Sequence, residues 1–175
     1  MKYSDNKQLR LFFALWPDNG VRNELVQINK KLAKQTQGKQ MRSENLHITL
    51  AFLGNVPADS LNCLLPIAKN ISFTHFELKL DHLGSFPRAQ IIWAGIKNEP
   101  EPLMTLSAEL YKGVAACGIH LENQPFKPHL TLMRKVKQLT EFSFKPVYWS
   151  VNNFCLISSV SKPEGVEYHV LHRWP

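Results

Sequence analysis

Two histidine–threonine pairs recur in the same local frame. The stretch "LHITL" places His47 two residues before Thr49, and "PHLTL" places His129 two residues before Thr131. Side chains on a strand alternate between its two faces, so within each pair the imidazole and the hydroxyl point to the same side. One such pair could be a core histidine bonded to a neighbouring group. Two pairs in one chain favour a shared site.

Two imidazoles facing one cleft suit paired acid–base catalysis. The unperturbed pKa of histidine is about 6.5, so near neutrality one ring can accept a proton while a protonated partner donates one. The two threonine hydroxyls carry no charge and could hold the non-bridging oxygens of a phosphate. Such a site needs neither a metal nor another cofactor. A metal bound by both histidines and completed by Asp or Glu stays open as an alternative.

Several other site types lack their sequence signatures. No Cys pair or H-x-x-x-H completes a zinc site, and no G-x-S-x-G supplies a nucleophile elbow. Neither G-x-x-x-x-G-K-[ST] nor G-x-G-x-x-G occurs, so no phosphate loop indicates an ATP-dependent step.

Hydrophobic spacing predicts the elements that position the motifs. Apolar residues at helical spacing predict helices over about residues 18–36, from residue 57 onward, and over 101–118. Strand-like runs cover residues 9–16, 46–54, 73–86, 90–96, 128–134, 147–160 and 166–174.

The order of these elements indicates an internal duplication. Phe13 and Ala14 precede His47 by 34 and 33 residues, and Trp93 and Ala94 precede His129 by 36 and 35, an offset of two. We therefore expect one domain over residues 1–175, with pseudo-symmetric halves at about 9–86 and 90–174. A pseudo-two-fold axis would bring the two motif strands side by side.

The paired motifs resemble those of the two-histidine (2H) phosphoesterase superfamily. Within it, "RLFFAL", "LHITLAFLG", "FPRAQIIWAG", "FKPHLTLMR" and "LHRW" resemble the RNA 2′,3′-cyclic phosphodiesterases of bacteria and archaea, first described as 2′-5′ RNA ligases. The resemblance implies a bilobal α+β fold, with antiparallel sheets lining a central groove and helices outside. It also implies cofactor-free hydrolysis of a terminal 2′,3′-cyclic phosphate to a 2′-phosphate. His47 would then be the proton donor and His129 the proton acceptor.

The same residues are compatible with two alternative functions. An RNA- or nucleotide-binding module could keep the groove without turnover. An ATP-independent 2′-5′ RNA ligase would run the same chemistry backwards, although mass action by water favours hydrolysis.

Four further residues are candidate substrate contacts. Arg134 follows His129 by five residues, an odd offset that points it to the other face of a regular strand. The family has an arginine at this place, and a bulge could turn it toward phosphate. Phe13 and Phe52 could stack a base, with core packing as the alternative. Arg88, like Arg10 and Lys127, could steer RNA or be a solvated charge.

The composition bounds partners and location. The chain of 175 residues has 21 Lys and Arg against 14 Asp and Glu, a balance that favours polyanions such as RNA ends. The longest apolar run, "LFFALW", is too short to span a bilayer. Three widely spaced cysteines, Cys63, Cys117 and Cys155, indicate reduced thiols rather than a disulfide framework. We expect a cytoplasmic monomer with no obligatory protein partner and no membrane association.

Overall fold

A computed structural model describes residues 7–122, 125–138 and 141–175. Its helices are α1 (Asn19–Ala33), α2 (Leu61–Lys69) and α3 (Glu101–Ala116), with short 3-10 turns η1 (Ser43–Asn45), η2 (Ala58–Ser60) and η3 (Pro87–Ala89). Its strands are β1 (Gln8–Leu15), β2 (Lys39–Gln40), β3 (Ile48–Pro57), β4 (Phe76–Leu80), β5 (His82–Phe86), β6 (Ile91–Gly95), β7 (His129–Arg134), β8 (Val147–Val151), β9 (Phe154–Lys162) and β10 (Gly165–Trp174).

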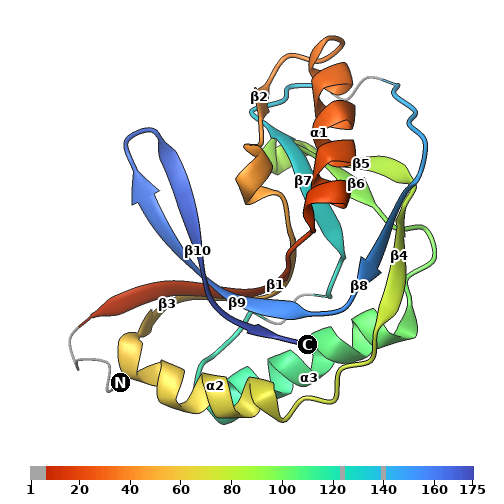
Figure 1. The fold of residues 1–175 in the computed structure, drawn as a ribbon. Coiled ribbons are helices and arrows are strands. Elements are labelled where there is room, and N and C mark those ends of the chain that lie inside the picture. Colours follow the sequence, from red (N-terminus) through yellow and green to blue (C-terminus); the bar gives the residue numbers. More distant parts are fainter. Residues whose placement is uncertain (1–6, 123–124, 139–140) are drawn as a thin grey trace.

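One antiparallel sheet runs through both halves of the molecule (Figure 1). Its strands follow the order β10-β9-β1-β3-β7-β6-β5, and β2 pairs with β7 at one end. A two-stranded sheet, β4-β8, stands apart. The α+β fold with antiparallel strands and pseudo-two-fold duplication is therefore confirmed. The halves share a continuous sheet, joined where β3 meets β7.

Two predicted strands are each split at a corner. Residues 73–86 form β4 and β5, which belong to different sheets, and residues 147–160 form β8 and β9, which also separate. At the first corner the main-chain N–H of Asp81 donates to Gly95 O at 2.9 Å, and the Asp81 carboxylate accepts from Lys97 N at 3.1 Å. Apolar alternation runs through both corners, so it does not mark the turn.

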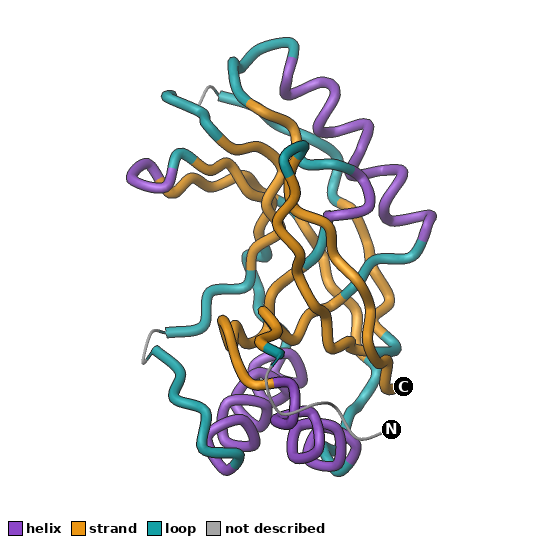
Figure 2. The backbone as a smooth tube through the Cα atoms, turned by 90° about the vertical axis from the view of Figure 1, so that its left-hand side faces the viewer, coloured by secondary structure: helices purple, strands orange, loops and turns teal. Residues whose placement is uncertain are grey.

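The three helices lie at two ends of the molecule. Figure 2 shows α2 and α3 together at one end of the molecule and α1 at the other, with the strands between them. The first predicted helix begins as expected, because Asp18 caps it by accepting from Val21 N at 2.9 Å. It ends at residue 33 rather than 36, and the helix predicted from residue 57 begins at 61 after the turn η2.

The cysteine prediction is wrong for two of the three residues. Cys63 in α2 and Cys117 at the end of α3 form a disulfide, while Cys155 is a buried free thiol. The two helices approach closely: a Cβ built on Gly113 of α3 would lie 2.3 Å from Ile67 of α2. This packing brings together two cysteines that lie 54 residues apart in sequence.

Removing this disulfide is expected to lower stability without changing turnover. For a loop of 54 residues, the chain-entropy model predicts that the Cys63→Ser, Cys117→Ser double variant loses at most about 4 kcal/mol of its free energy of unfolding. Denaturant unfolding, with and without a thiol reductant, measures the free energy of unfolding. The reductant should destabilise the wild type and leave the double variant unaffected. Equal sensitivity of the two proteins would contradict this expectation.

Candidate active site

The four motif side chains share one face of the sheet where its halves meet. Ile48 of β3 pairs with Leu130 of β7, and both side chains are fully buried on the helix side. Their neighbours in sequence, His47 with Thr49 and His129 with Thr131, therefore point to the opposite face. If the antiparallel register of this one pair is continued by one residue in each direction, His47 lies opposite Thr131 and Thr49 lies opposite His129. The pseudo-two-fold axis passes between Ile48 and Leu130.

A β-bulge follows each motif at the same position. In β3, Thr49 and Ala51 pair with two consecutive residues of β1, so Leu50 between them is the extra residue of a bulge. In β7, Thr131 and Met133 likewise pair with two consecutive residues of β6, so Leu132 is the extra residue. Ala14 pairs with Thr49 and Trp93 pairs with Thr131, so Ala14 and Trp93 occupy equivalent positions in the two halves. The offset between the halves is therefore three residues rather than two.

The bulges explain why side chains at an odd offset join the site. An extra residue reverses the facing of the residues that follow it. Phe52 and Arg134, each five residues after its motif histidine, consequently line the same pocket as His47 and Thr49. The two residues occupy equivalent places in the two halves, so one half presents an aromatic ring where the other presents a guanidinium.

Each bulge is held by a buried polar side chain from a helix of the other half. Ser107 Oγ of α3 donates to Leu50 O at 2.9 Å, and Asn29 Nδ2 of α1 donates to Leu132 O at 2.9 Å. A bulge interrupts the ladder of backbone bonds, and these side chains bond to the carbonyl of the extra residue in each half; Leu132 O also accepts from Met41 N at 2.8 Å. Neither Ser107 nor Asn29 was predicted from the sequence. The available signal was a polar residue within or beside the apolar stripe of a helix.

Both imidazoles are oriented in the same way by the main chain. His47 Nδ1 lies 2.7 Å from Asn45 O, and His129 Nδ1 lies 2.7 Å from Lys127 O. A carbonyl can only accept, so Nδ1 carries a proton on each ring and Nε2 is the nitrogen that changes protonation state. The Nε2 atom of His47 lies 3.1 Å from Thr49 Oγ1. Either ring can therefore act as base when neutral or as acid when charged.

Aromatic rings surround both histidines. Trp16 stacks on His47 with ring centroids 5.5 Å apart, and Phe12 and Tyr168 contact the same imidazole at 5.0 and 5.2 Å. Phe86 meets His129 edge-on at 5.0 Å. These rings cover part of each imidazole, and both histidines remain partly exposed.

This burial sets the protonation of the free protein. Burial is the largest cause lowering the pKa of His47 to about 4, and the charges of Arg134 and His129 add to it. Burial also lowers the pKa of His129, helped by Lys127 and Arg134. The Nδ1 bonds to the main chain oppose both shifts. Both rings are therefore neutral near pH 7 until an anion enters.

Anion binding is consequently expected to take up a proton. A bound anion favours the charged imidazole, so the pKa rises, and between the free and the bound value each binding event draws a proton from solution. Affinity should fall as the pH rises through that range. Calorimetric titration with sulfate at about pH 6.5, in two buffers of different ionisation enthalpy, measures the uptake. We expect close to one proton per sulfate and clearly less in His47→Ala. Sulfate binding without proton uptake would contradict the expected pKa increase.

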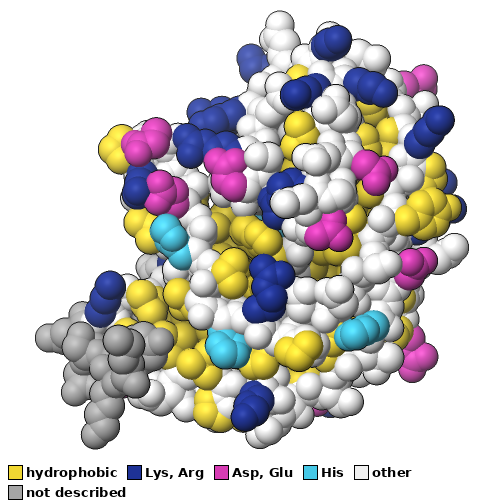
Figure 3. Space-filling view, in the orientation of Figure 1, with side chains coloured by type: hydrophobic (Ala, Val, Ile, Leu, Met, Phe, Trp, Pro, Cys, Tyr) yellow, Lys and Arg dark blue, Asp and Glu magenta, His cyan; other side chains and the backbone are white. Residues whose placement is uncertain are grey.

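The pocket beside these residues has a volume of about 620 Å³. Its floor includes Phe52, which is 48% exposed and lies under the Arg10 guanidinium, with Cζ 5.0 Å from the ring centroid. Figure 3 shows Lys and Arg side chains gathered beside the β9–β10 hairpin. The pocket is lined by one acidic residue, Glu164, and by five basic residues: Arg10, Lys39, Arg42, Arg134 and Lys135.

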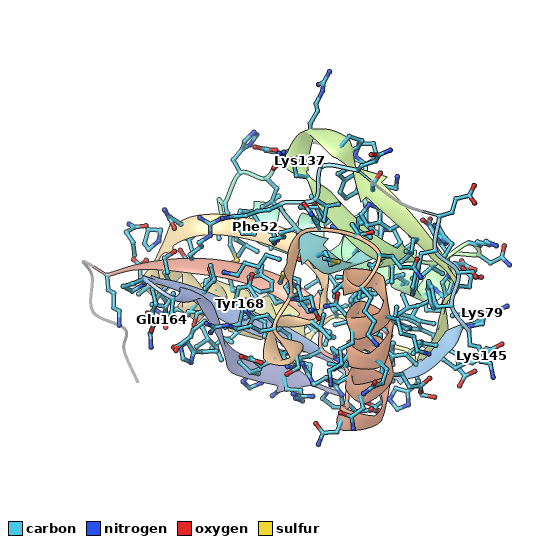
Figure 4. The ribbon with its side chains drawn as sticks, turned by 90° about the horizontal axis from the view of Figure 1, so that it is seen from above. Phe52, Lys79, Lys137, Lys145, Glu164 and Tyr168 are labelled. Carbon is cyan, nitrogen blue, oxygen red and sulfur yellow. A yellow bond between two sulfur atoms is a disulfide. The ribbon has the colours of Figure 1, made fainter. Side chains whose placement is uncertain are left out.

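The β9–β10 hairpin forms one wall of the pocket. Figure 4 shows Glu164 and Tyr168 on this hairpin, on the same side of the molecule as Phe52. Two side chains bond the hairpin to η1: Arg42, just before η1, donates from Nη2 to Glu164 O, and Asn45, the last residue of η1, donates from Nδ2 to Val166 O, both at 3.0 Å. Asn45 thus orients His47 through its carbonyl and is also bonded to the hairpin, whose Tyr168 packs against the same imidazole.

Two of the candidate substrate contacts lie away from the pocket lining. Phe13 is 1% exposed in the core between sheet and helices, so the prediction that it contacts substrate is wrong. Its neighbour Phe12 faces the pocket instead, because alternate residues of β1 face opposite sides. Arg88 is exposed on η3, next to the lining residues Ala89 and Gln90.

Within the described ranges, no three His, Cys, Asp or Glu side chains gather where they could hold a metal ion. No described helix is long and apolar enough to cross a membrane.

A family model for LigT-like phosphoesterases matches this chain twice, over residues 15–93 and 95–168. The chain belongs to the LigT-like phosphoesterase family. The two matches fall on the two halves that the motifs and bulges define.

Individual members of the LigT-like family are similar over nearly the whole chain. The RNA 2′,3′-cyclic phosphodiesterase of Escherichia coli is 32% identical over 167 residues, which cover 94% of this chain and 95% of that protein. The Archaeoglobus fulgidus protein of the same name is 30% identical, over 91% of this chain and 96% of its own. The crystal structure of E. coli LigT complexed with 3′-AMP superposes with a TM-score of 0.89 at 30% identity, covering 96% and 98% of the two chains.

Proposed function

We propose that this protein hydrolyses terminal 2′,3′-cyclic phosphates of RNA to 2′-phosphates, without a cofactor. The observation that carries the proposal is the matched pair of imidazoles, each with Nδ1 bonded to a main-chain carbonyl and Nε2 left for proton transfer. Relatives of about 30% identity over most of the chain bear the name of this activity. We treat residues 1–175 as one such enzyme domain, which acts as a monomer.

The proposed reaction is a single displacement at phosphorus. His129 Nε2 accepts a proton from water as its oxygen attacks phosphorus, and the bond from phosphorus to the 3′-oxygen breaks. His47 Nε2 donates its proton to that leaving oxygen, which gives a 2′-phosphate and a free 3′-hydroxyl. The roles of the two histidines follow the family resemblance, since the geometry around them is nearly symmetric. Proton exchange with solvent then resets both rings.

The remaining candidate residues stabilise the charge and hold or steer the nucleotide. Thr49 and Thr131 donate to the non-bridging oxygens, and Arg134 neutralises the charge that grows on them. Phe52 stacks the terminal base, with the Arg10 guanidinium above its ring. Arg88 stays outside this set as a residue that steers RNA toward the pocket.

The proposal is tested with an RNA oligonucleotide that ends in a 2′,3′-cyclic phosphate, incubated in excess EDTA. We expect turnover and a product carrying only a 2′-phosphate, identified by phosphorus NMR. Tight binding without turnover would favour a binding module, and loss of activity in EDTA would favour a metal site. Since RNA is a cytoplasmic substrate, we place the activity there. A disulfide is unusual in that compartment, so the redox state of Cys63 and Cys117 in cells bears on this location.

A further inference from the structure

We propose that Lys39, Arg42 and Lys135 form a second anion site, which binds the phosphate preceding the cyclic end. This inference rests on the proposed function and specifies its substrate as an oligonucleotide of at least two nucleotides. All three side chains line the pocket that contains Arg134 and His47.

The first observation is a pair of like charges directly opposite each other. Lys39 of β2 pairs with Arg134 of β7, so their side chains leave the same face of the sheet. Arg134 lines the pocket with His47 and Thr49, and its charge lowers the pKa of both histidines, so it lies beside the proposed place of the cyclic phosphate. Like charges opposite each other destabilise a strand pair. Among the described residues no carboxylate pairs with Lys39, Arg134 or Lys135, and a bound polyanion would offset this repulsion.

The second observation is that the backbone brings these charges together at a local cost. Lys135 has a φ of 58° and Gln90 a φ of 55°, a region that non-glycine residues rarely adopt. The bond from Val136 N to Gln90 O, at 3.0 Å, holds these two turns against each other. Strained backbone of this kind concentrates at ligand sites.

The third observation is the close approach of β2 to β7. A Cβ on Gly38 would lie 2.7 Å from Val136 Cγ2 and 3.0 Å from Arg134 O, so only glycine permits this approach. Beyond β2, the Arg42 side chain is fixed over the pocket by its bond to Glu164 O. Three cations thus stand beside Arg134 on a short edge that reaches from β7 to the hairpin.

These charges exceed what a cyclic mononucleotide needs. Its one phosphate is served by the two histidines, the two threonines and Arg134. An RNA strand carries a further phosphodiester just before its terminal nucleotide, and Lys39, Arg42 and Lys135 are the remaining cations on this side of the pocket. We therefore expect kcat/KM to be higher for a dinucleotide with a 2′,3′-cyclic end than for a nucleoside 2′,3′-cyclic phosphate.

The test compares these two substrates in the wild type, Lys39→Gln and Lys135→Asn. Asparagine tolerates the positive φ at position 135. Each variant should lower kcat/KM for the dinucleotide by about tenfold, the value of one charged hydrogen bond, and that for the mononucleotide much less. The slope of log kcat/KM against log salt for the dinucleotide should also become shallower by about 0.7 per variant. Lys145→Gln, an exposed lysine on another side of the molecule (Figure 4), is the matched control and should change neither substrate.

Two outcomes would overturn the second anion site. Equal losses on both substrates would place these lysines at the cyclic phosphate, and no loss on either would leave them as charges that merely protect an edge strand. A wild type that hydrolyses neither substrate would refute the proposed function instead. In that case, fluorescence titration with a dinucleotide 2′-phosphate still tests the site, because Lys39→Gln should then weaken binding about tenfold.

Discussion

Alanine at either motif histidine is expected to lower kcat by about 10²- to 10⁴-fold, the usual contribution of one general acid or base. In the proposed mechanism, His47 and His129 act on the two ends of one displacement, so losing either would disable the same step. The double variant should therefore lose far less than the product of the two single losses. Steady-state kinetics with a cyclic-ended RNA in EDTA measures all three variants.

Matched variants separate the pair from general damage. His120 is an exposed histidine that belongs to neither H-x-T-L motif and does not line the pocket, so His120→Ala should leave kcat unchanged. Thr49→Ala and Thr131→Ala each remove one uncharged donor and should cost less than either histidine, about ten- to a hundredfold. If His47→Ala abolished activity while His129→Ala left it intact, the paired mechanism would be wrong.

Arg134→Gln is expected to lower kcat/KM by about a hundredfold, the value of a charge-assisted pair of hydrogen bonds to phosphate. Asn29 supports the bulge that turns Arg134 into the pocket, through its bond to Leu132 O. Asn29→Leu should therefore lower kcat/KM about tenfold in the wild type and have little further effect in Arg134→Gln.

The coupling between Asn29 and Arg134 can be measured without large folding defects. Leu132 O also accepts from Met41 N at 2.8 Å, and Asn29 Oδ1 has no hydrogen-bond partner among the described residues. The Asn29→Leu variant, which places an apolar residue of similar size at this position, should therefore still fold. Ser107→Ala is the control, because Ser107 supports the bulge before Phe52 and should combine additively with Arg134→Gln. Additive losses for Asn29→Leu and Arg134→Gln would contradict the coupling.

The local patterns predicted the motifs and their arrangement well. The repeated H-x-T-L frame predicted that His47 and His129 share one face. The odd offset of Arg134 indicated the other face of a regular strand, and the bulge that the family resemblance would require there is present. Phe13 rather than Phe12 was predicted to contact substrate, because β1 lies inside the sheet and both rings belong to one apolar run. The available signal was Arg10, which lies two residues before Phe12 and lines the pocket with it. The register of β1 with β3 decides which ring meets His47.

Long-range packing supplied what the sequence did not reveal. The bonds of Asn29 and Ser107 join each helix to a motif strand of the other half, at separations of 103 and 57 residues. The disulfide depends on α2 and α3 packing closely at Gly113. Neither arrangement follows from periodicity, which describes one element at a time.

The central claim, that the two imidazoles act as donor and acceptor, is tested most directly with a sulfur leaving group. In a 2′,3′-cyclic phosphorothiolate with sulfur at the 3′ position, the departing thiolate is a much weaker base than an alkoxide and needs little help from an acid. We predict that His47→Ala hydrolyses this substrate at nearly the wild-type rate, while His129→Ala keeps its full defect. Equal defects for both variants on the oxygen and sulfur substrates would contradict the account.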